Sequence, residues 1–307
     1  MKILVAGSTG LVGSAVVRYF VKQKANVIGF SSKDVNLLDR ESTFLFIQQH
    51  SPDVVIDAAA KVGGIGANDS YPVQFLSENL QIQTNLIDSC HQANVGRFIF
   101  LGSSCIYPKL AQQPIKESEL LNGHLEPTNS AYAIAKIAGI ELINSYRKQY
   151  FRNWISLMPA NLYGPGDNYN IDNGHVLPSL INKFHSAKIE GKTEVELWGD
   201  GSVSREFLYV DDLADAIYFC MERYDESGHL NVGSGEEVQI KNLAQTIARI
   251  VGYSGKIIWN TSMPNGTPRR ILDGSKLKKL GWSASTKLET GIKNTYHSFL
   301  SETHTRS

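Results

Sequence analysis

The first twenty residues constrain the fold of this chain more than any other segment. Lys2–Ala6 is a short apolar run, and Gly7, Gly10 and Gly13 follow it at intervals of three. Residues 14–20 then show helical apolar spacing. A short apolar run that ends at glycine is typical of a strand buried on both faces of a parallel sheet. The segment therefore predicts a strand, a tight turn and a helix.

Glycine in such a turn permits the sharp bend, lets the backbone approach a pyrophosphate and lets the helix pack on the strand. The N-terminus of the helix then faces the anion. The turn predicts a dinucleotide site whose binding residues are Gly7, Gly10, Leu11, Val12 and Gly13. The alternative is a glycine-rich turn that holds no ligand.

Apolar runs of strand length recur at 26–30, 53–57, 97–101 and 154–158, with helical stretches between them. Strands that alternate with helices require right-handed crossovers between parallel strands. The expected fold class is therefore α/β, a Rossmann-type doubly wound parallel sheet with a smaller C-terminal α/β substrate domain.

Loop-forming residues become dense near residue 165, and this change of texture suggests two domains that interleave in the sequence. We expect residues 1–165 plus about 206–234 to form the dinucleotide-binding domain. About 166–205 plus 235–307 would form the substrate domain. A length of 307 residues is enough for two hydrophobic cores.

Charge and cysteine content exclude several classes of protein. The 30 basic and 30 acidic residues give a formal net charge of zero, which argues against a broad electrostatic grip on nucleic acid. Cys90, Cys105 and Cys220 are odd in number and far apart, so they predict neither a disulfide framework nor a metal site. With no apolar run of about 18 residues and no signal-peptide pattern, we expect a cytoplasmic protein that is not bound to membranes.

The end of the second predicted strand bears on which dinucleotide binds. NAD sites of this fold usually place a carboxylate there to hold the ribose hydroxyls. Here Ser31, Ser32 and Lys33 occupy the position, and two hydroxyls with a cation suit a 2′-phosphate better. We expect NADP(H); the alternative is a polar loop that happens to lack an acid.

Ser103 follows the fourth predicted strand, and Tyr132 and Lys136 lie about thirty residues further on. Positions i and i+4 share a helix face, so the Lys136 ammonium is expected near the Tyr132 phenol. A nearby cation would lower the pKa of the phenol and make it a usable general acid toward a carbonyl oxygen. The alternative is an ordinary amphipathic helix.

The order of the glycine turn, Ser103 and Tyr132-x-x-x-Lys136 resembles the extended short-chain dehydrogenase/reductases that act on nucleotide sugars. Within them, the chain is similar to the epimerase/reductases that convert GDP-4-keto-6-deoxy-mannose to GDP-L-fucose. The blocks that carry this resemblance are 58–65, 101–109, 126–129, 131–139, 161–165 and 205–208. It runs from the first strand to about Trp282.

The resemblance implies NADP(H) as cofactor, a GDP-sugar as substrate and a homodimer. Besides the glycine turn, the serines, Lys33, Tyr132 and Lys136, it implies cofactor contacts at Asp39, Ala58, Ala59, Asn161, Leu162 and His175. The substrate contacts it implies are Lys61, Ser104, Asn161, Val176, Lys183, Trp198, Arg205 and Arg269.

The same resemblance implies a chemistry in which a 4-ketone acidifies the protons at C3 and C5. Cys105 as a thiolate base and His175 as an imidazolium acid would invert both centres before C4 is reduced. Cysteine as a small buried hydrophobe and histidine as a surface loop residue are the alternatives. Arg205 and Arg269 are expected to clamp the diphosphate, unless each forms a surface ion pair.

Two departures from the family pattern are visible. Ser8-Thr9 stands inside the glycine turn where the family often has His-Arg, and Ser130-Ala131 precedes the tyrosine in place of Glu-Pro. The first weakens the preference for NADP or hands the phosphate to Lys33. Three alternatives stay open: a colitose-type C5-epimerase/reductase, a plain 4-ketoreductase, and a non-catalytic nucleotide-sugar or redox sensor.

Overall fold

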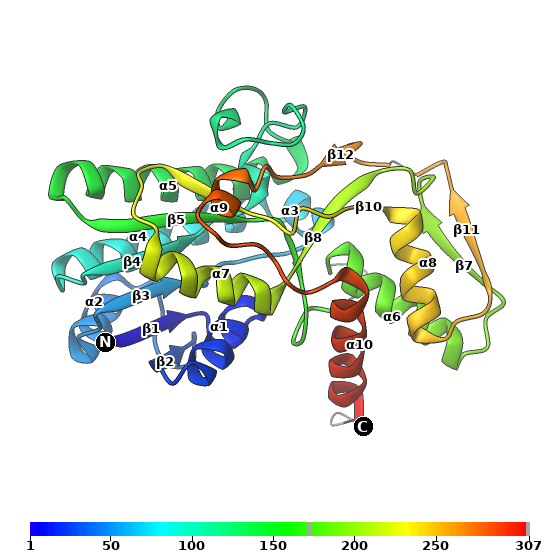
Figure 1. The fold of residues 1–307 in the computed structure, drawn as a ribbon, viewed down its shortest axis with the longest axis horizontal. Coiled ribbons are helices and arrows are strands. Elements are labelled where there is room, and N and C mark those ends of the chain that lie inside the picture. Colours follow the sequence, from blue (N-terminus) through cyan, green and yellow to red (C-terminus); the bar gives the residue numbers. More distant parts are fainter. Residues whose placement is uncertain (171–173, 264, 305–307) are drawn as a thin grey trace.

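The computed structural model describes residues 1–170, 174–263 and 265–304. Its larger part is built on a parallel sheet of six strands in the order β2-β1-β3-β4-β5-β9, which confirms the predicted α/β, Rossmann-type fold (Figure 1). The strands are β1 (Lys2–Ala6), β2 (Asn26–Phe30), β3 (Val54–Asp57), β4 (Arg97–Leu101), β5 (Asn153–Pro159) and β9 (His229–Val232).

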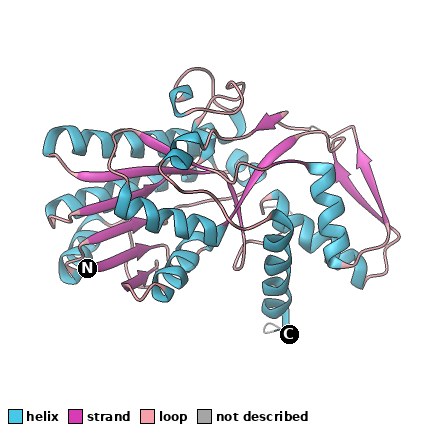
Figure 2. Ribbon diagram, viewed as in Figure 1, coloured by secondary structure: helices cyan, strands magenta, loops and turns pink. Residues whose placement is uncertain are grey.

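Helices cover both faces of this sheet, as expected for strands that are apolar on both sides. Helices α1 (Leu11–Lys22) and α7 (Val210–Arg223) pack together on one face. The other face carries α2 (Arg40–His50), α4 (Pro72–Gln92) and α5 (Ser130–Tyr150) (Figure 2). The carboxyl ends of β1, β3, β4 and β5 therefore meet at one edge of the sheet, where ligands of this fold bind.

A smaller part lies beyond that edge. It contains one sheet of β6 (Asn161–Tyr163), β8 (Ser204–Tyr209), β10 (Glu237–Gln239) and β12 (Arg269–Arg270), and a pair of strands, β7 (Glu194–Trp198) and β11 (Lys256–Asn260). Helices α6 (Val176–Ile189), α8 (Ile240–Val251) and α10 (Leu288–His304) pack with these strands. The remaining short helices are α3 (Ile65–Ser70), α9 (Ser275–Lys279), η1 (Ser104–Ile106), η2 (Glu117–Glu119) and η3 (Pro127–Asn129).

Two separate hydrophobic clusters underlie the two parts. The larger cluster also includes Leu272, Leu277 and Trp282, and the Trp282 indole donates a hydrogen bond to Asp215 of α7 (2.7 Å). The chain thus returns from the smaller part to the larger core before α10 begins. Among the described residues, no helix is long and apolar enough to cross a membrane.

Candidate active site

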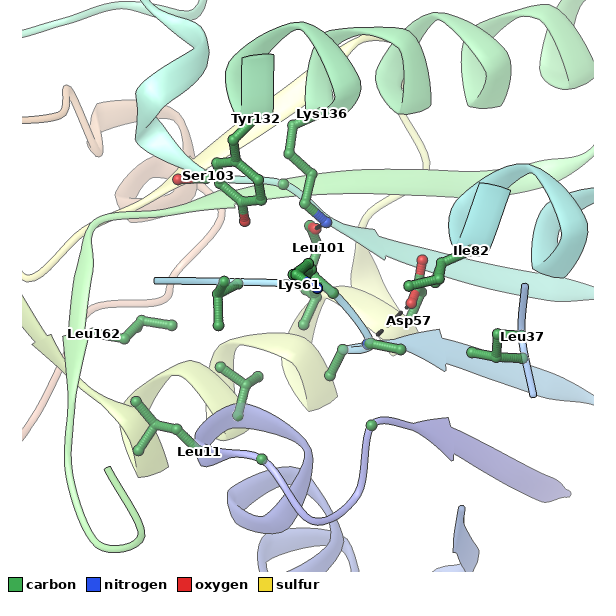
Figure 3. Close-up of a pocket in the computed structure, with 18 of the residues that line it drawn as sticks. Leu11, Leu37, Asp57, Lys61, Ile82, Leu101, Ser103, Tyr132, Lys136 and Leu162 are labelled. Atoms are coloured by element: carbon green, nitrogen blue, oxygen red, sulfur yellow. Dashed lines mark hydrogen bonds between the residues drawn. The ribbon is translucent and has the colours of Figure 1, made fainter. Parts of the chain in front are cut away.

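A cavity of about 600 Å³ opens at the carboxyl edge of the large sheet (Figure 3). Residues from widely separated stretches of the chain line it, and most of the residues expected from the sequence are among them. They are Gly7, Gly10, Leu11, Val12, Ser31, Ser32, Ala58, Ala59, Lys61, Ser103, Ser104, Tyr132, Lys136, Asn161, Leu162 and His175.

The glycine turn is shaped so that side chains are excluded from it. Gly7 has φ +73°, and a Cβ there would lie 2.7 Å from the carbonyl oxygen of Ala58. A Cβ on Gly13 would lie 2.2 Å from the carbonyl oxygen of Gly7, so Gly13 serves the close packing of α1 rather than the cavity wall. Helix α1 begins after Gly10 with no side-chain cap. Its first N–H groups therefore remain available, and the turn fits a dinucleotide pyrophosphate.

In the loop after β2, the charged residues are not placed as expected for a site that binds a 2′-phosphate. The carboxylate of Asp34 accepts hydrogen bonds from the backbone N–H (2.8 Å) and hydroxyl (3.0 Å) of Ser31, which lowers the pKa of Asp34. The acid is thereby tied to its own turn. Ser32 lines the cavity, whereas the Lys33 side chain is exposed and does not.

Asp39, expected to contact the cofactor, is the N-cap of α2 instead. Its carboxylate accepts a hydrogen bond of 2.6 Å from the backbone N–H of Ser42 and does not line the cavity. An acidic residue just before a helix is a common capping pattern, and this signal was present in the sequence.

Helix α5 and the end of β4 bring Ser103, Tyr132 and Lys136 to one wall of the cavity (Figure 3). The Lys136 ammonium donates a hydrogen bond of 2.9 Å to the carbonyl oxygen of Leu101 and lies 5.9 Å from the centroid of the Tyr132 ring. The constellation is therefore assembled as the spacing predicted.

The electrostatics of Tyr132 differ from the expectation that Lys136 lowers its pKa. Burial raises the pKa of Tyr132 well above its usual value, and the charges of Cys105 and Asp57 act in the same direction. Burial also lowers the pKa of the Lys136 ammonium. Desolvation is the largest cause here, so the phenol is held in the protonated form that a proton donor needs.

Lys61 stands at the cavity with its charge already partnered. Its ammonium contacts both carboxylate oxygens of Glu78 (3.1 and 2.9 Å). The buried amide of Asn79 accepts a hydrogen bond from the Lys61 N–H and donates one to the Lys61 carbonyl oxygen. Asn79 therefore fixes the backbone of this cavity segment.

Cys105 is the middle residue of the short helix η1, which begins directly after Ser103. The Ser103 hydroxyl accepts a hydrogen bond from the Cys105 N–H (3.4 Å), and the thiol is buried. Burial raises the pKa of the Cys105 thiol, although Ser103, Arg270 and Lys136 oppose this shift. The thiol is favoured over the thiolate that the sequence led us to expect.

His175 is the other member of the expected acid/base pair. It directly precedes α6 and lines the cavity. His175 is exposed to solvent, yet the surrounding protein lowers the pKa of its imidazole by desolvation. The neutral imidazole is favoured over the expected imidazolium. Thiol plus imidazole and thiolate plus imidazolium hold the same number of protons, so the two forms of the expected pair differ only in the position of one proton.

The two arginines expected to clamp a diphosphate point to opposite sides of the small sheet. Arg269 forms a two-pronged ion pair with the carboxylate of Glu237 (2.9 and 2.7 Å). Its neighbour Arg270 is in register with Arg205 across strands β12 and β8. Because successive residues of a strand face opposite sides, Arg270 rather than Arg269 shares the face of Arg205.

The Arg205–Arg270 pair has the properties of an anion site. Both guanidinium groups are half-buried, and neither forms a salt bridge with a carboxylate in the described part of the chain. Burial lowers the pKa of both guanidinium groups, and the charge of Arg270 further lowers the pKa of Arg205. Arg270 also lowers the pKa of the Cys105 thiol, which shows that the two groups are near each other. Two like charges held together beside Cys105 favour a bound anion. Sequence reasoning missed Arg270.

The family described as "Epimerase: NAD dependent epimerase/dehydratase family" matches residues 3–233. The chain belongs to this family. It is 51 % identical over 300 residues to GDP-L-fucose synthase 1 of Arabidopsis thaliana, covering 97 % of this chain and 93 % of that protein. It is 47 % identical over 309 residues to GDP-L-fucose synthase of Escherichia coli (strain K12), covering 97 % and 96 %.

Among solved structures of this epimerase family, a GDP-L-fucose synthetase from Naegleria fowleri bound to NADP is similar over nearly its whole length. The TM-score is 0.92 at 30 % identity, covering 99 % of this chain and 95 % of that one. The likeness therefore extends over both parts of the fold.

The remaining expected substrate residues lie on α6 and β7 of this epimerase-family chain, outside the cavity lining. Val176 is the first residue of α6, and the Lys183 ammonium donates to the carbonyl oxygen of Glu196 (2.5 Å). Trp198 ends β7 with 65 % of its surface exposed. An exposed indole and a cation on neighbouring elements of the smaller part remain predicted substrate contacts.

Proposed function

We propose that this chain uses NADPH to convert GDP-4-keto-6-deoxy-D-mannose to GDP-L-fucose by epimerisation at C3 and C5 and reduction at C4. One observation carries the proposal: the cavity joins a dinucleotide turn to Ser103, Tyr132 and Lys136. Beside them lie Cys105 and the Arg205–Arg270 pair, which forms no salt bridge with any described carboxylate. Relatives about half identical over their full length are named GDP-L-fucose synthases.

The cofactor would lie along the edge of the sheet, held by the glycine turn and α1 at its pyrophosphate. Ala58, Ala59, Asn161 and Leu162 would contact it along the cavity wall. NADPH when bound supplies the hydride for C4. The binding of Asp34 to its own turn supports NADP over NAD, because no free carboxylate then meets the 2′-phosphate, and Ser31 and Ser32 face the cavity.

In the reduction, Tyr132 would donate its proton to O4 of the sugar, and Ser103 would hydrogen-bond the same oxygen. Burial keeps the Tyr132 phenol protonated, and the Lys136 ammonium stands behind its ring. As O4 gains negative charge, the phenol proton moves to it and the ammonium stabilises the phenolate that forms.

In the epimerisation, Cys105 and His175 would remove and return the protons at C3 and C5, which the 4-keto group makes acidic. Burial raises the pKa of the Cys105 thiol and lowers the pKa of the His175 imidazole, which favours the neutral form of each before substrate binds. The hydrogen bond between the Cys105 N–H and the Ser103 hydroxyl supports a role for Cys105 beside the ketone that Ser103 and Tyr132 would hold.

The nucleotide end of the substrate would reach the smaller part. Arg205 and Arg270 would bind the diphosphate, since a bidentate guanidinium suits phosphate oxygens. Ser104 and Lys61 line the cavity and would contact the sugar, and Val176, Lys183 and Trp198 would contact the nucleotide from α6 and β7.

We also propose a homodimer through α4 and α5. These helices pack on each other, and their outer surface carries Val73 and Ile134, which are 71 % and 48 % exposed. Sedimentation of the purified protein tests this, with a mass of twice 33.9 kDa expected. A cytoplasmic location stays a prediction, which the three unpaired cysteines support.

The direct test is to incubate the protein with GDP-4-keto-6-deoxy-D-mannose and NADPH and to identify the sugar by NMR. GDP-L-fucose is expected. A product inverted only at C5, or reduced without inversion, would assign the chain to one of the alternative reductases. Absence of NADPH oxidation would favour the sensor.

A further inference from the structure

Asp57 is a buried carboxylate that the proposed chemistry does not use. It ends β3, has 0 % of its surface exposed and lines the cavity. One oxygen, Oδ1, accepts a hydrogen bond from the N–H of Ala59 (3.1 Å). The other, Oδ2, is buried and makes no hydrogen bond to any residue that the structure describes. Such an oxygen is costly unless it serves a partner.

Lys136 is a buried cation with too few partners for its hydrogen-bond donors. It is only 3 % exposed, and its ammonium has three N–H donors. One donates to the Leu101 carbonyl oxygen, and within the described residues the ammonium forms no salt bridge with a carboxylate. A buried ammonium needs a negative charge nearby to stay protonated.

The sheet brings these two groups to one place. Asp57 is in register with Phe100 on the neighbouring strand β4, so both side chains project to the same face. The Lys136 ammonium lies 4.7 Å from the centroid of the Phe100 ring. Figure 3 shows Lys136 extending from α5 and Asp57 projecting from the end of β3 into the same space.

We propose that Asp57 is the counter-charge of Lys136, a positioning residue that acts through its charge and keeps the ammonium behind Tyr132 protonated. The catalytic consequence rests on the proposed function, whereas the charge pairing itself does not. Asp57 acts only through Lys136 and touches no reacting atom.

Other titratable groups also face this pair. Cys105 approaches Lys136 from η1, Tyr132 lies on α5 itself, and Cys90 faces Asp57 from α4. Burial lowers the pKa of Lys136, and Asp57 is the first charge that raises it. Burial raises the pKa of Asp57 to about 6, and Lys136 opposes that shift. Asp57 also raises the pKa of Tyr132. Removal of its charge should therefore lower the pKa of both catalytic groups.

A double-variant cycle tests the pairing without any substrate. Urea unfolding at pH 7.5 is compared for the unchanged protein, Asp57→Asn, Lys136→Met and the double variant. Asp57→Asn should lower the unfolding midpoint of the unchanged protein, because it leaves a buried ammonium alone. In the Lys136→Met background it should raise the midpoint, because it removes a buried charge that has lost its partner.

The same midpoint change in both backgrounds would overturn the proposal, since the two charges would then act independently. If Asp57→Asn alone yields no folded protein, a folded double variant supports the pairing and an unfolded one contradicts it.

The pH profile of NADPH oxidation with GDP-4-keto-6-deoxy-D-mannose tests the consequence for catalysis. Asp57→Asn should move the alkaline limb of the profile toward acid by about one pH unit. Cys90→Ala, which removes a neutral buried thiol near Asp57 and changes no charge, should leave the limb in place. A lower but unshifted profile for Asp57→Asn would mean that Asp57 is merely structural. If the unchanged protein does not turn over this substrate, the proposed function fails while the unfolding cycle still decides the pairing.

Discussion

The two sides of the active-site cleft are built by different means. On the cofactor side, a glycine turn, an uncapped helix end and an i, i+4 pair on α5 form the site, and all three are local features of the chain. On the substrate side, Arg205 and Arg270 come from strands β8 and β12 and lie 65 positions apart in the sequence.

This difference decides what can be predicted from the sequence. A turn or a helix face is determined by residues that are neighbours in the chain. A pair of cations across two strands is determined by sheet register, and a shift of one residue turns a side chain to the other face. The glycine turn and the Tyr132–Lys136 pair were therefore predictable, although the predicted cofactor contacts Lys33 and Asp39 do not line the cavity. The substrate side was predictable only in the kind of residue involved.

The strongest test of the cofactor side is Tyr132→Phe. The variant keeps the ring, which packs edge-on against Phe75 at 6.3 Å, and loses the proton donor. Turnover should fall roughly 10²-fold or more while NADPH binding persists. Stopped-flow turnover and fluorescence titration of NADPH measure the two quantities. Near-normal turnover would show that another acid serves O4.

Cys105→Ser separates proton exchange from reduction. A hydroxyl hardly ionises near neutrality, so deuterium uptake from D₂O at C3 and C5 should slow at least about tenfold. Tyr132→Phe is the matched control and should still exchange these protons without NADPH. NMR of the recovered sugar follows the exchange. Uptake at the unchanged rate at both carbons would make Cys105 a packing residue.

The two adjacent arginines of β12 allow a test of which one binds the substrate. Arg270→Met should raise KM for the GDP-sugar about tenfold or more, since a charged hydrogen bond to phosphate is lost. Arg269→Met, on the opposite face and paired with Glu237, should change KM little. Initial rates at varied substrate concentration measure both. The reverse order of effects would mean that the register of β12 and β8 is not the one in solution.

The smallest expected effect concerns His229, which joins β9 to the turn that carries Cys105. Its Nε2 and the Tyr107 hydroxyl are 2.9 Å apart, and burial lowers the pKa of His229 to about 4. The unfolded chain binds a proton near pH 6.5, so this histidine's contribution to stability is present above pH 6.5 and is lost as pH falls toward 4.

His229→Gln does not titrate and should reduce this acid sensitivity. Between pH 6.5 and 4, its free energy of unfolding should fall by about 1 kcal/mol less per pH unit than that of the unchanged protein. Urea unfolding at several pH values measures this. Parallel curves would show that His229 is protonated in the folded protein.

Several residues show why the site could not be predicted in full from the sequence. The spacing of Tyr132 and Lys136 predicted their meeting, but not that burial would raise the pKa of the phenol. The capping pattern at Asp39 is typical of a residue that begins a helix, whereas the family resemblance implied a cofactor contact. In the structure Asp39 caps α2. Arg269 and Arg270 are adjacent and chemically alike, so only the sheet could choose between them. Asp57 gave no signal, because its partner lies on a distant helix.

One reaction in D₂O tests the central claim most directly. The protein is given GDP-4-keto-6-deoxy-D-mannose and NADPH, and the product is analysed by NMR and mass spectrometry. The proposed function predicts GDP-L-fucose with deuterium at C3 and C5 and with hydrogen from NADPH at C4. A 4-reduced sugar that keeps its original configuration and carries no deuterium at C3 or C5 would contradict it.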